Sequence, residues 1–294
     1  MRTYPTLLED PHDEALFEHY TTSQIAEVGL DGSVRELGEP AMVESISLSP
    51  DGEHLLVTRI ERPFSYITSY RDFPRATLIL DRNGSRVSEV AYRPLDEGGG
   101  DDDGESEARG FAWLPDGSGL AFMRRAEQDE ADDEALRPDR IFRVDAPFDL
   151  EEAELLAESE HPIRSMSVSR DGEHLFATVV DGGEQGIAHW EIDPESESAA
   201  SDPTMIVAFH DTDDPTALPG ELWTRETGNG VGYAMVSGDG ESAYLRGDGY
   251  KADFRPQPFV DRVRLADGST ERIFEGARDS FDQPQSPWTP MWTA

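Results

Sequence analysis

Serine and histidine are the residues of this sequence best suited to hydrolytic chemistry, but their spacing does not build a site. The serine nucleophile of an α/β-hydrolase lies in G-x-S-x-G between a strand and a helix. Residues 240–244 (GESAY) and 104–108 (GESEA) both lack the last glycine. None of the seven histidines forms an H-x-x-x-H or H-x-H metal pair, and His54 and His174 follow the same repeated turn, which indicates a structural role. The sequence therefore predicts no catalytic residue of its own, no metal site and no cofactor.

Acidic clusters at residues 101–103 and 129–134 could bind calcium loosely, but neither has the spacing of a calcium-binding loop. We interpret them as solvated loops.

The most unusual polar and aromatic grouping is residues 62–66 (RPFSY), followed by Tyr70, Arg71 and Phe73. Two arginines among aromatic side chains could hold a carboxylate with paired hydrogen bonds. The alternative is an arginine stacked on aromatic rings to close a loop. We take Arg62, Tyr66 and Arg71 as candidate contacts for a substrate or for a partner surface.

A repeated turn indicates which elements position these residues. Residues 49–52 (SPDG) join two alternating apolar strands, and variants recur at 114–117 (LPDG), 169–172 (SRDG) and 237–240 (SGDG). Proline and aspartate favour such a turn, and glycine accepts the left-handed conformation that closes it. Hairpins repeated every 55 to 68 residues, with more strands between them, are typical of β-propeller blades.

The sequence thus predicts an all-β fold: a β-propeller of four to five four-stranded blades, as an incomplete ring, with a short N-terminal helix that begins near His12. A strand pair at 25–28 and 34–37 has no inner hairpin before it, and 233–236 is expected as the innermost strand of the last blade. The expected divisions are a helical extension (1–21), a half-module (22–40), modules 41–98, 99–160, 161–228 and 229–280, and a proline-rich tail (281–294).

Charge limits the classes of partner. The 294 residues carry a net charge of −37, and Lys251 is the only lysine. This predicts neither nucleic acid nor membrane as a partner, and it suggests a salt-accumulating cytoplasm, where high ionic strength screens the repulsion. The absence of cysteine agrees with a reducing compartment, and no signal peptide is recognisable.

Several segments together resemble the N-terminal propeller of glutamyl endopeptidase-like serine peptidases, of the prolyl oligopeptidase class. The resemblance covers residues 2 to 275. Its segments are 2–4 (RTY), 7–8 (LL), 11–17 (PHDEALF), Tyr20, 22–24 (TSQ), 49–52 (SPDG), 62–66 (RPFSY), 73–74 (FP), 139–140 (DR), 145–148 (DAPF), 255–256 (RP) and 258–262 (PFVDR).

This resemblance implies a propeller that caps a hydrolase domain and filters access to a Ser-Asp-His triad, although no family catalytic residue maps onto the matching positions. The expected function is the non-catalytic, truncated propeller portion of such an enzyme, inactive alone, with peptides or a complementary hydrolase domain as partners. Exposed blade faces would also favour self-association. The alternatives are a stand-alone propeller for peptide or protein interaction and, ranked last, an independent hydrolase with a metal in its channel, as in lactonases.

Overall fold

The computed structural model describes residues 7–98, 108–126, 138–193, 200, 202–253 and 255–277. The expected acidic clusters and the expected proline-rich tail lie outside these ranges. No helix among the described residues is long and apolar enough to cross a bilayer.

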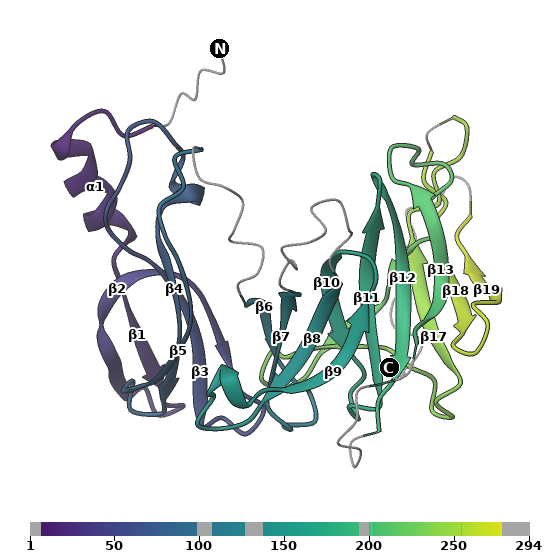
Figure 1. The fold of residues 1–294 in the computed structure, drawn as a ribbon, viewed down its shortest axis with the longest axis horizontal. Coiled ribbons are helices and arrows are strands. Elements are labelled where there is room, and N and C mark those ends of the chain that lie inside the picture. The colour runs from purple at the N-terminus through teal and green to yellow at the C-terminus, as the bar shows by residue number, and fades with distance from the viewer. Residues whose placement is uncertain are drawn as a thin grey trace, which may run out of the picture. The chain divides into compact units, whose positions relative to one another are not determined.

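The described chain is mostly antiparallel sheet, as predicted (Figure 1). It divides into two compact units. Unit 1 is Met1–Asp129, Arg140–Leu155 and Gly228–Val231, and unit 2 is Glu130–Asp139, Leu156–Thr227 and Gly232–Ala294.

Unit 1 contains the predicted helix α1 (Pro11–Thr21) and a five-stranded sheet in the order β1-β2-β3-β4-β5. Its strands are β1 (Ser23–Val28), β2 (Val34–Leu48), β3 (His54–Ile60), β4 (Arg75–Asp81) and β5 (Arg86–Arg93). A second sheet has the order β6-β7-β8-β9, with strands β6 (Arg109–Trp113), β7 (Leu120–Arg125), β8 (Asp139–Val144) and β9 (Glu154–Ser159). The first residue of β8 and the end of β9 from Leu156 belong to unit 2.

Unit 2 contains two more four-stranded sheets. One is β10-β11-β12-β13, formed by β10 (Ile163–Val168), β11 (His174–Asp181), β12 (Glu184–Glu191) and β13 (Thr204–Asp211). The other is β14-β17-β18-β19, formed by β14 (Glu221–Leu222), β17 (Ser242–Gly247), β18 (Phe259–Arg264) and β19 (Thr270–Glu275). A separate pair consists of β15 (Thr224–Glu226) and β16 (Gly232–Ala234).

The predicted turns are present, and three of them share one hydrogen-bond pattern. The hydroxyls of Ser49, Ser169 and Ser237 each donate to the aspartate two residues later. Each hydroxyl also accepts the backbone N–H five residues later, at 2.9 to 3.0 Å. In the second turn leucine replaces this serine, and Asp116 instead accepts from Ser118. Each turn therefore carries the bonds that close it, and this explains why the pattern was readable in the sequence.

The half-module and the first module are not separated as the sequence suggested. Strand β2 runs without a break from Val34 to Leu48; its first half pairs with β1 and its second half with β3. Ile25 of β1 and Leu37 of β2 pack together with Leu55 of β3 and Leu78 of β4 in one apolar cluster.

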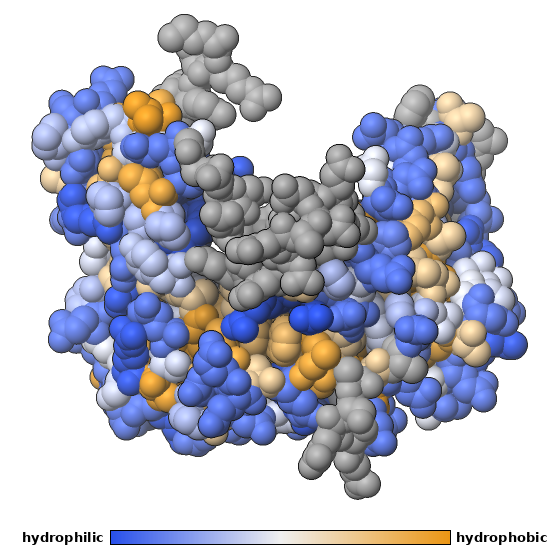
Figure 2. Space-filling view, viewed as in Figure 1, coloured by the Kyte–Doolittle hydropathy of each residue, from blue (hydrophilic) through white to orange (hydrophobic). Residues whose placement is uncertain are grey.

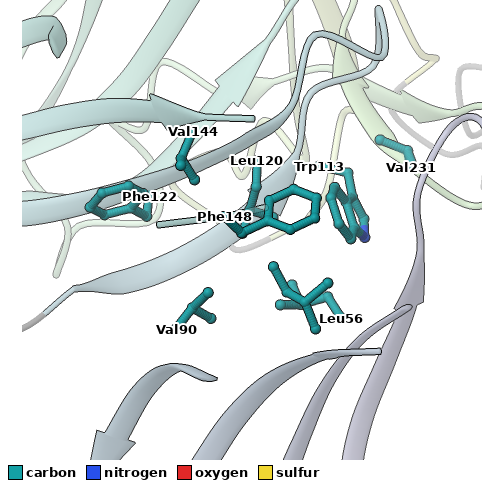
Figure 3. Packing of buried hydrophobic residues seen from close by; sticks show 9 residues of the cluster. Leu56, Val90, Trp113, Leu120, Phe122, Val144, Phe148 and Val231 are labelled. Carbon is teal, nitrogen blue, oxygen red and sulfur yellow. The ribbon is translucent and has the colours of Figure 1, made fainter. Parts of the chain in front are cut away.

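A second apolar cluster fills the space between the two sheets of unit 1 (Figure 3). Leu56, Ile79 and Val90 come from the first sheet, and Trp113 and Phe148 belong to the second sheet and its loops. Val231 completes the cluster from a distant part of the chain, and the neighbouring Asn229 donates to the backbone C=O of Pro50 at 2.7 Å.

The last sheet differs from the sequence-based expectation. Residues 233–236 were expected to form its innermost strand, but β16 pairs with β15, and only Val236 bridges to Ala243. The short strand β14 takes the place beside β17, and the backbone N–H of Trp223 continues the pairing to Tyr244 at 2.8 Å. Trp223 is 4% exposed, so burial of its large side chain favours this arrangement.

Candidate functional site

The candidate residues lie on the loop 61–74, which joins β3 to β4 in unit 1. Two aromatic side chains anchor this loop: Phe64 is 8% exposed and Phe73 1%, and their rings stack at 5.2 Å. The loop contains a short 3-10 helix, η1 (Tyr70–Asp72), which Ser69 caps by accepting from the N–H of Arg71. These contacts hold the loop in one defined conformation.

Helix α1 packs directly on this loop. Asp10 caps its first turn by accepting from the N–H groups of His12 and Asp13 at 2.8 and 3.0 Å, as a helix N-terminus requires. Phe17 meets Phe64 edge to face at 5.2 Å and Phe73 at 5.7 Å. We call α1 and the loop 61–74 together the helix–loop site.

The structure brings Arg62 and Tyr66 together on the helix. Arg62 pairs with Glu14 at 2.8 Å and with Glu18 at 2.9 Å, and its guanidinium lies 4.5 Å from the centre of the Phe64 ring. The Tyr66 hydroxyl donates to Glu14 at 2.6 Å. The hydrogen bonds from Tyr66 and Arg62 hold the pKa of the Glu14 carboxyl below its usual range. The carboxylates that these two residues bind in this structure thus come from their own chain.

Arg71 is placed differently. Its backbone C=O accepts hydrogen bonds from Arg75, at 2.6 Å, and from Arg93, while its exposed guanidinium makes no ion pair with the described residues. Near it in sequence, Tyr66, Ile67 and Tyr70 are 42%, 67% and 49% exposed. We call Tyr66, Ile67, Tyr70 and Arg71 the loop crest.

Sequence reasoning missed Glu14, Glu18 and Ile67. The two glutamates lie one turn apart on α1, so they share a helix face. This spacing of four residues was visible in the sequence and could have indicated a shared cation as their partner. Ile67 is an apolar residue on a polar loop, and its exposure becomes visible only in the folded structure.

The strand histidines have structural environments. The His54 ring packs against Phe148 at 5.0 Å and Trp113 at 6.4 Å. His174 Nδ1 lies 3.1 Å from His189 Nε2 in the interior of unit 2. Within the described part of the chain, no group of three or more histidines and carboxylates could hold a metal ion.

The antiparallel sheets of four or five strands, three of which adjoin the same serine-closed turn, define the class of fold: these are blades of a β-propeller. Among solved structures, prolyl oligopeptidase B from Galerina marginata bound to a 35mer hydrolysis and macrocyclization substrate matches with a TM-score of 0.51. The match has 14% sequence identity and covers 85% of this chain and 33% of that chain, and it supports the fold alone.

Comparison with curated proteins gives the relatives. A probable chloroplastic glutamyl endopeptidase of Oryza sativa subsp. japonica is 27% identical over 289 residues, and one of Arabidopsis thaliana is 26% identical over 294 residues. Each match covers 96% of this chain and 30% of the relative, so the chain spans less than a third of the relatives' length. No family model matches. The comparisons confirm the resemblance to glutamyl endopeptidases.

Proposed function

We propose that this chain is the non-catalytic propeller portion of a prolyl oligopeptidase-type serine peptidase, and that it binds or gates peptides for a hydrolase domain carried elsewhere. The observation that supports this most is the pattern of coverage: nearly the whole chain aligns with glutamyl endopeptidases, but with only 30% of their length. Peptide cleavage then depends on the complementary part.

The loop crest is the proposed contact surface. Arg71 carries a guanidinium without an ion pair among the described residues, and Tyr66 and Tyr70 expose aromatic rings beside it in sequence. A guanidinium binds a carboxylate through two parallel hydrogen bonds, and tyrosine adds contact area with little loss of conformational freedom. The relatives are named glutamyl endopeptidases, so a glutamyl side chain is the proposed partner of Arg71. Arg62 stabilises the loop that carries the crest, because its ion pairs with Glu14 and Glu18 hold α1 against that loop.

A binding measurement tests the crest. The double variant Arg62→Ala, Arg71→Ala should weaken the binding of a fluorescent glutamate-containing peptide, followed by anisotropy, about tenfold or more, because charged hydrogen bonds contribute about 1.5–3 kcal/mol each. The single variant Arg71→Ala measures how much of this loss of affinity comes from direct contact by Arg71, and the remainder comes from the loop stabilisation that Arg62 provides. Arg86→Ala is the matched control, since Arg86 forms an exposed pair with Glu89 on β5. Unchanged peptide binding in the double variant would refute the proposal that the loop crest is the contact surface.

Activity is measured separately. The chain alone should not cleave the same peptide, and addition of a hydrolase portion from a relative should permit cleavage. Cleavage by this chain alone, abolished by a serine-directed inhibitor, would contradict the proposed division of labour.

A stand-alone interaction module is the second candidate, and one observation favours it. The β1–β2 hairpin covers a face of the first sheet that would otherwise be exposed, through Ile25 and Leu37. The same hairpin leaves Val28, Leu30 and Val34 at 66%, 111% and 66% exposed, which is a surface suited to a protein partner. Light scattering after size exclusion in concentrated KCl distinguishes the two candidates: a compact monomer favours the module, and a dimer or aggregate favours the portion that lacks its complement.

A further inference from the structure

Unit 2 contains a pocket of about 300 Å³ that none of the candidate residues lines. Its lining comes from segments 215–221 and 246–250, from Pro258, and from the ends of β12 and β13 at Gln185 and His210. The volume is at the lower end of the range for small-molecule sites. The side chains that matter for its chemistry are His210, Leu218, Glu221, Arg246, Asp248 and Tyr250.

The backbone around the pocket is closely packed. The N–H of Gln257 donates to the C=O groups of Asp248 and Gly249 at 2.9 and 3.3 Å, which closes the loop 248–258. At Gly247 a Cβ would lie 2.6 Å from the ring of Phe259, so a larger residue could not be accommodated there. Lys251 Nζ also ties this loop to Glu275 on β19 at 3.3 Å. These contacts fix the backbone of the residues that line the pocket.

Arg246 is the cation of this pocket. It lies directly opposite Glu221 in the β14–β17 register, but the two side chains form no ion pair. By contrast, Arg143 and Arg272 pair with Glu154 and Asp261. In a chain of net charge −37, an arginine that lines a pocket without an ion pair among the described residues is available for the carboxylate of a ligand.

The other lining groups narrow the choice of ligand. His210 Nδ1 lies 3.1 Å from the C=O of Ala208 and donates to it, so Nε2 remains for a ligand. The carboxylates of Glu221 and Asp248 also line the pocket and would repel a simple anion. An ammonium group would find acceptors in them, while Leu218, which is 38% exposed, supplies apolar surface.

We infer that this pocket binds a small zwitterion, either a free amino acid or a dipeptide, with an apolar side chain. The ligand's carboxylate binds Arg246, its ammonium group lies toward Glu221 and Asp248, and its side chain packs on Leu218, Tyr250 and the adjoining prolines. A ligand with only one charge leaves one set of these groups without a partner. This inference does not depend on the proposed peptidase role.

Calorimetric titration with alanyl-leucine and with free leucine tests the inference and distinguishes the two sources. The amidated and the N-acetylated dipeptides should each bind about tenfold more weakly, because each lacks one charge. Arg246→Gln should weaken the dipeptide about tenfold and should remove the difference between the acid and the amide. Glu221→Gln should weaken the dipeptide but not its N-acetyl form.

The matched control is Arg264→Gln, since Arg264 is exposed on the same sheet at the opposite end of β18. Circular dichroism verifies that each variant is folded. No heat of binding up to about 10 mM, equal binding of acid and amide, or unchanged binding in folded Arg246→Gln would each overturn the inference.

Discussion

His174 and His189 form a buried pair on neighbouring strands of unit 2. Both are 7% exposed, and His189 also lies against Phe176, with 5.0 Å between ring centres. Burial and the charge of His174 lower the pKa of His189 to about 4. A second charge nearby, the carboxylate of Asp171, interacts with His174. The native protein therefore resists protonation of His189 at a pH where the unfolded chain accepts a proton.

This difference gives a pH window for stability. Unfolded histidine titrates near pH 6.5 and native His189 near pH 4, so the unfolded state binds more protons between these values. The free energy of unfolding should fall by up to about 3 kcal/mol as the pH decreases from about 6.5 to about 4. In His189→Gln this slope should be flatter, which urea denaturation at several pH values measures. A wild-type slope that Gln does not change would mean that another group titrates.

The aspartate carboxylates of the repeated turns affect stability in a lower pH range than His189. A hydrogen bond from the Ser49 hydroxyl lowers the pKa of Asp51, and one from Ser237 lowers that of Asp239. Stability that depends on a lowered carboxyl pKa is lost only as the pH falls toward that pKa, below about 4. The His189 effect should therefore be complete before the turns weaken.

The sequence left two interpretations open for Arg62, and it did not indicate the intramolecular partners that the structure shows. The residue types indicated carboxylate binding, and Arg62 does bind carboxylates, with its guanidinium over Phe64 as in the alternative of a closed loop. The partners Glu14 and Glu18 lie 48 and 44 residues away on α1. Only tertiary packing of Phe17 brings them within reach, and this contact has no signature in the loop sequence.

At the level of elements, Gly84 lies in the turn between β4 and β5 and packs closely against strand β2. It has a φ of +79° and closes the turn through its N–H to Asp81. A Cβ at this position would lie 2.0 Å from the backbone nitrogen of Gly38 and 2.5 Å from the carbonyl carbon of Leu37. The turn between β4 and β5 thus contacts β2 through backbone atoms on both sides.

Gly84→Ala should destabilise the protein by much more than the conformational penalty alone. Gly52→Ala is the matched control, because Gly52 has a φ of +73° with nothing within 4 Å of its Cβ position. The control should lose about 1–2 kcal/mol, the usual cost of a left-handed alanine. Gly84→Ala should lose about 2 kcal/mol more, since backbone atoms must move. Denaturant midpoints measure both, and equal losses would show that the β1–β2 hairpin moves aside freely.

Strand positions were predictable on both sides of the turn at Ser169, where the flanking strands β10 and β11 match the apolar alternation. Two features were not. The continuity of β2 through Gly38 is determined by its two different partners, and local sequence does not contain that information. The position of β14 depends on burial of Trp223 beside Tyr244, which is a tertiary effect that overrides strand propensity.

For the molecule as a whole, the net charge of −37 is the dominant physical fact. Hydrophilic residues cover most of the face in view (Figure 2). Exposed pairs such as Arg82–Glu53, with both side chains 54% exposed, contribute little to stability, and salt weakens them. Repulsion among the excess carboxylates opposes the compact state, and salt weakens this repulsion as well.

The thermal midpoint should therefore rise between 0.1 and 2 M KCl, since the screening length falls from about 10 Å to below about 3 Å. NaCl at the same ionic strength should act alike, because screening depends on ion charge and concentration. A midpoint that stays constant or falls in both salts would contradict the proposed adaptation to a salt-accumulating cytoplasm.

Lys251 gives the molecule a distinctive chemical property. Apart from the amino terminus, its Nζ is the sole primary amine, and it lies on the loop 248–258. An amine-reactive dye would thus label only Nζ of Lys251 and the amino terminus, without any engineered cysteine, and a lysine-specific protease could cut the backbone only after Lys251. The fluorophore would lie on the same loop as Tyr250, so the natural sequence already carries an attachment point for an optical reporter of ligand binding.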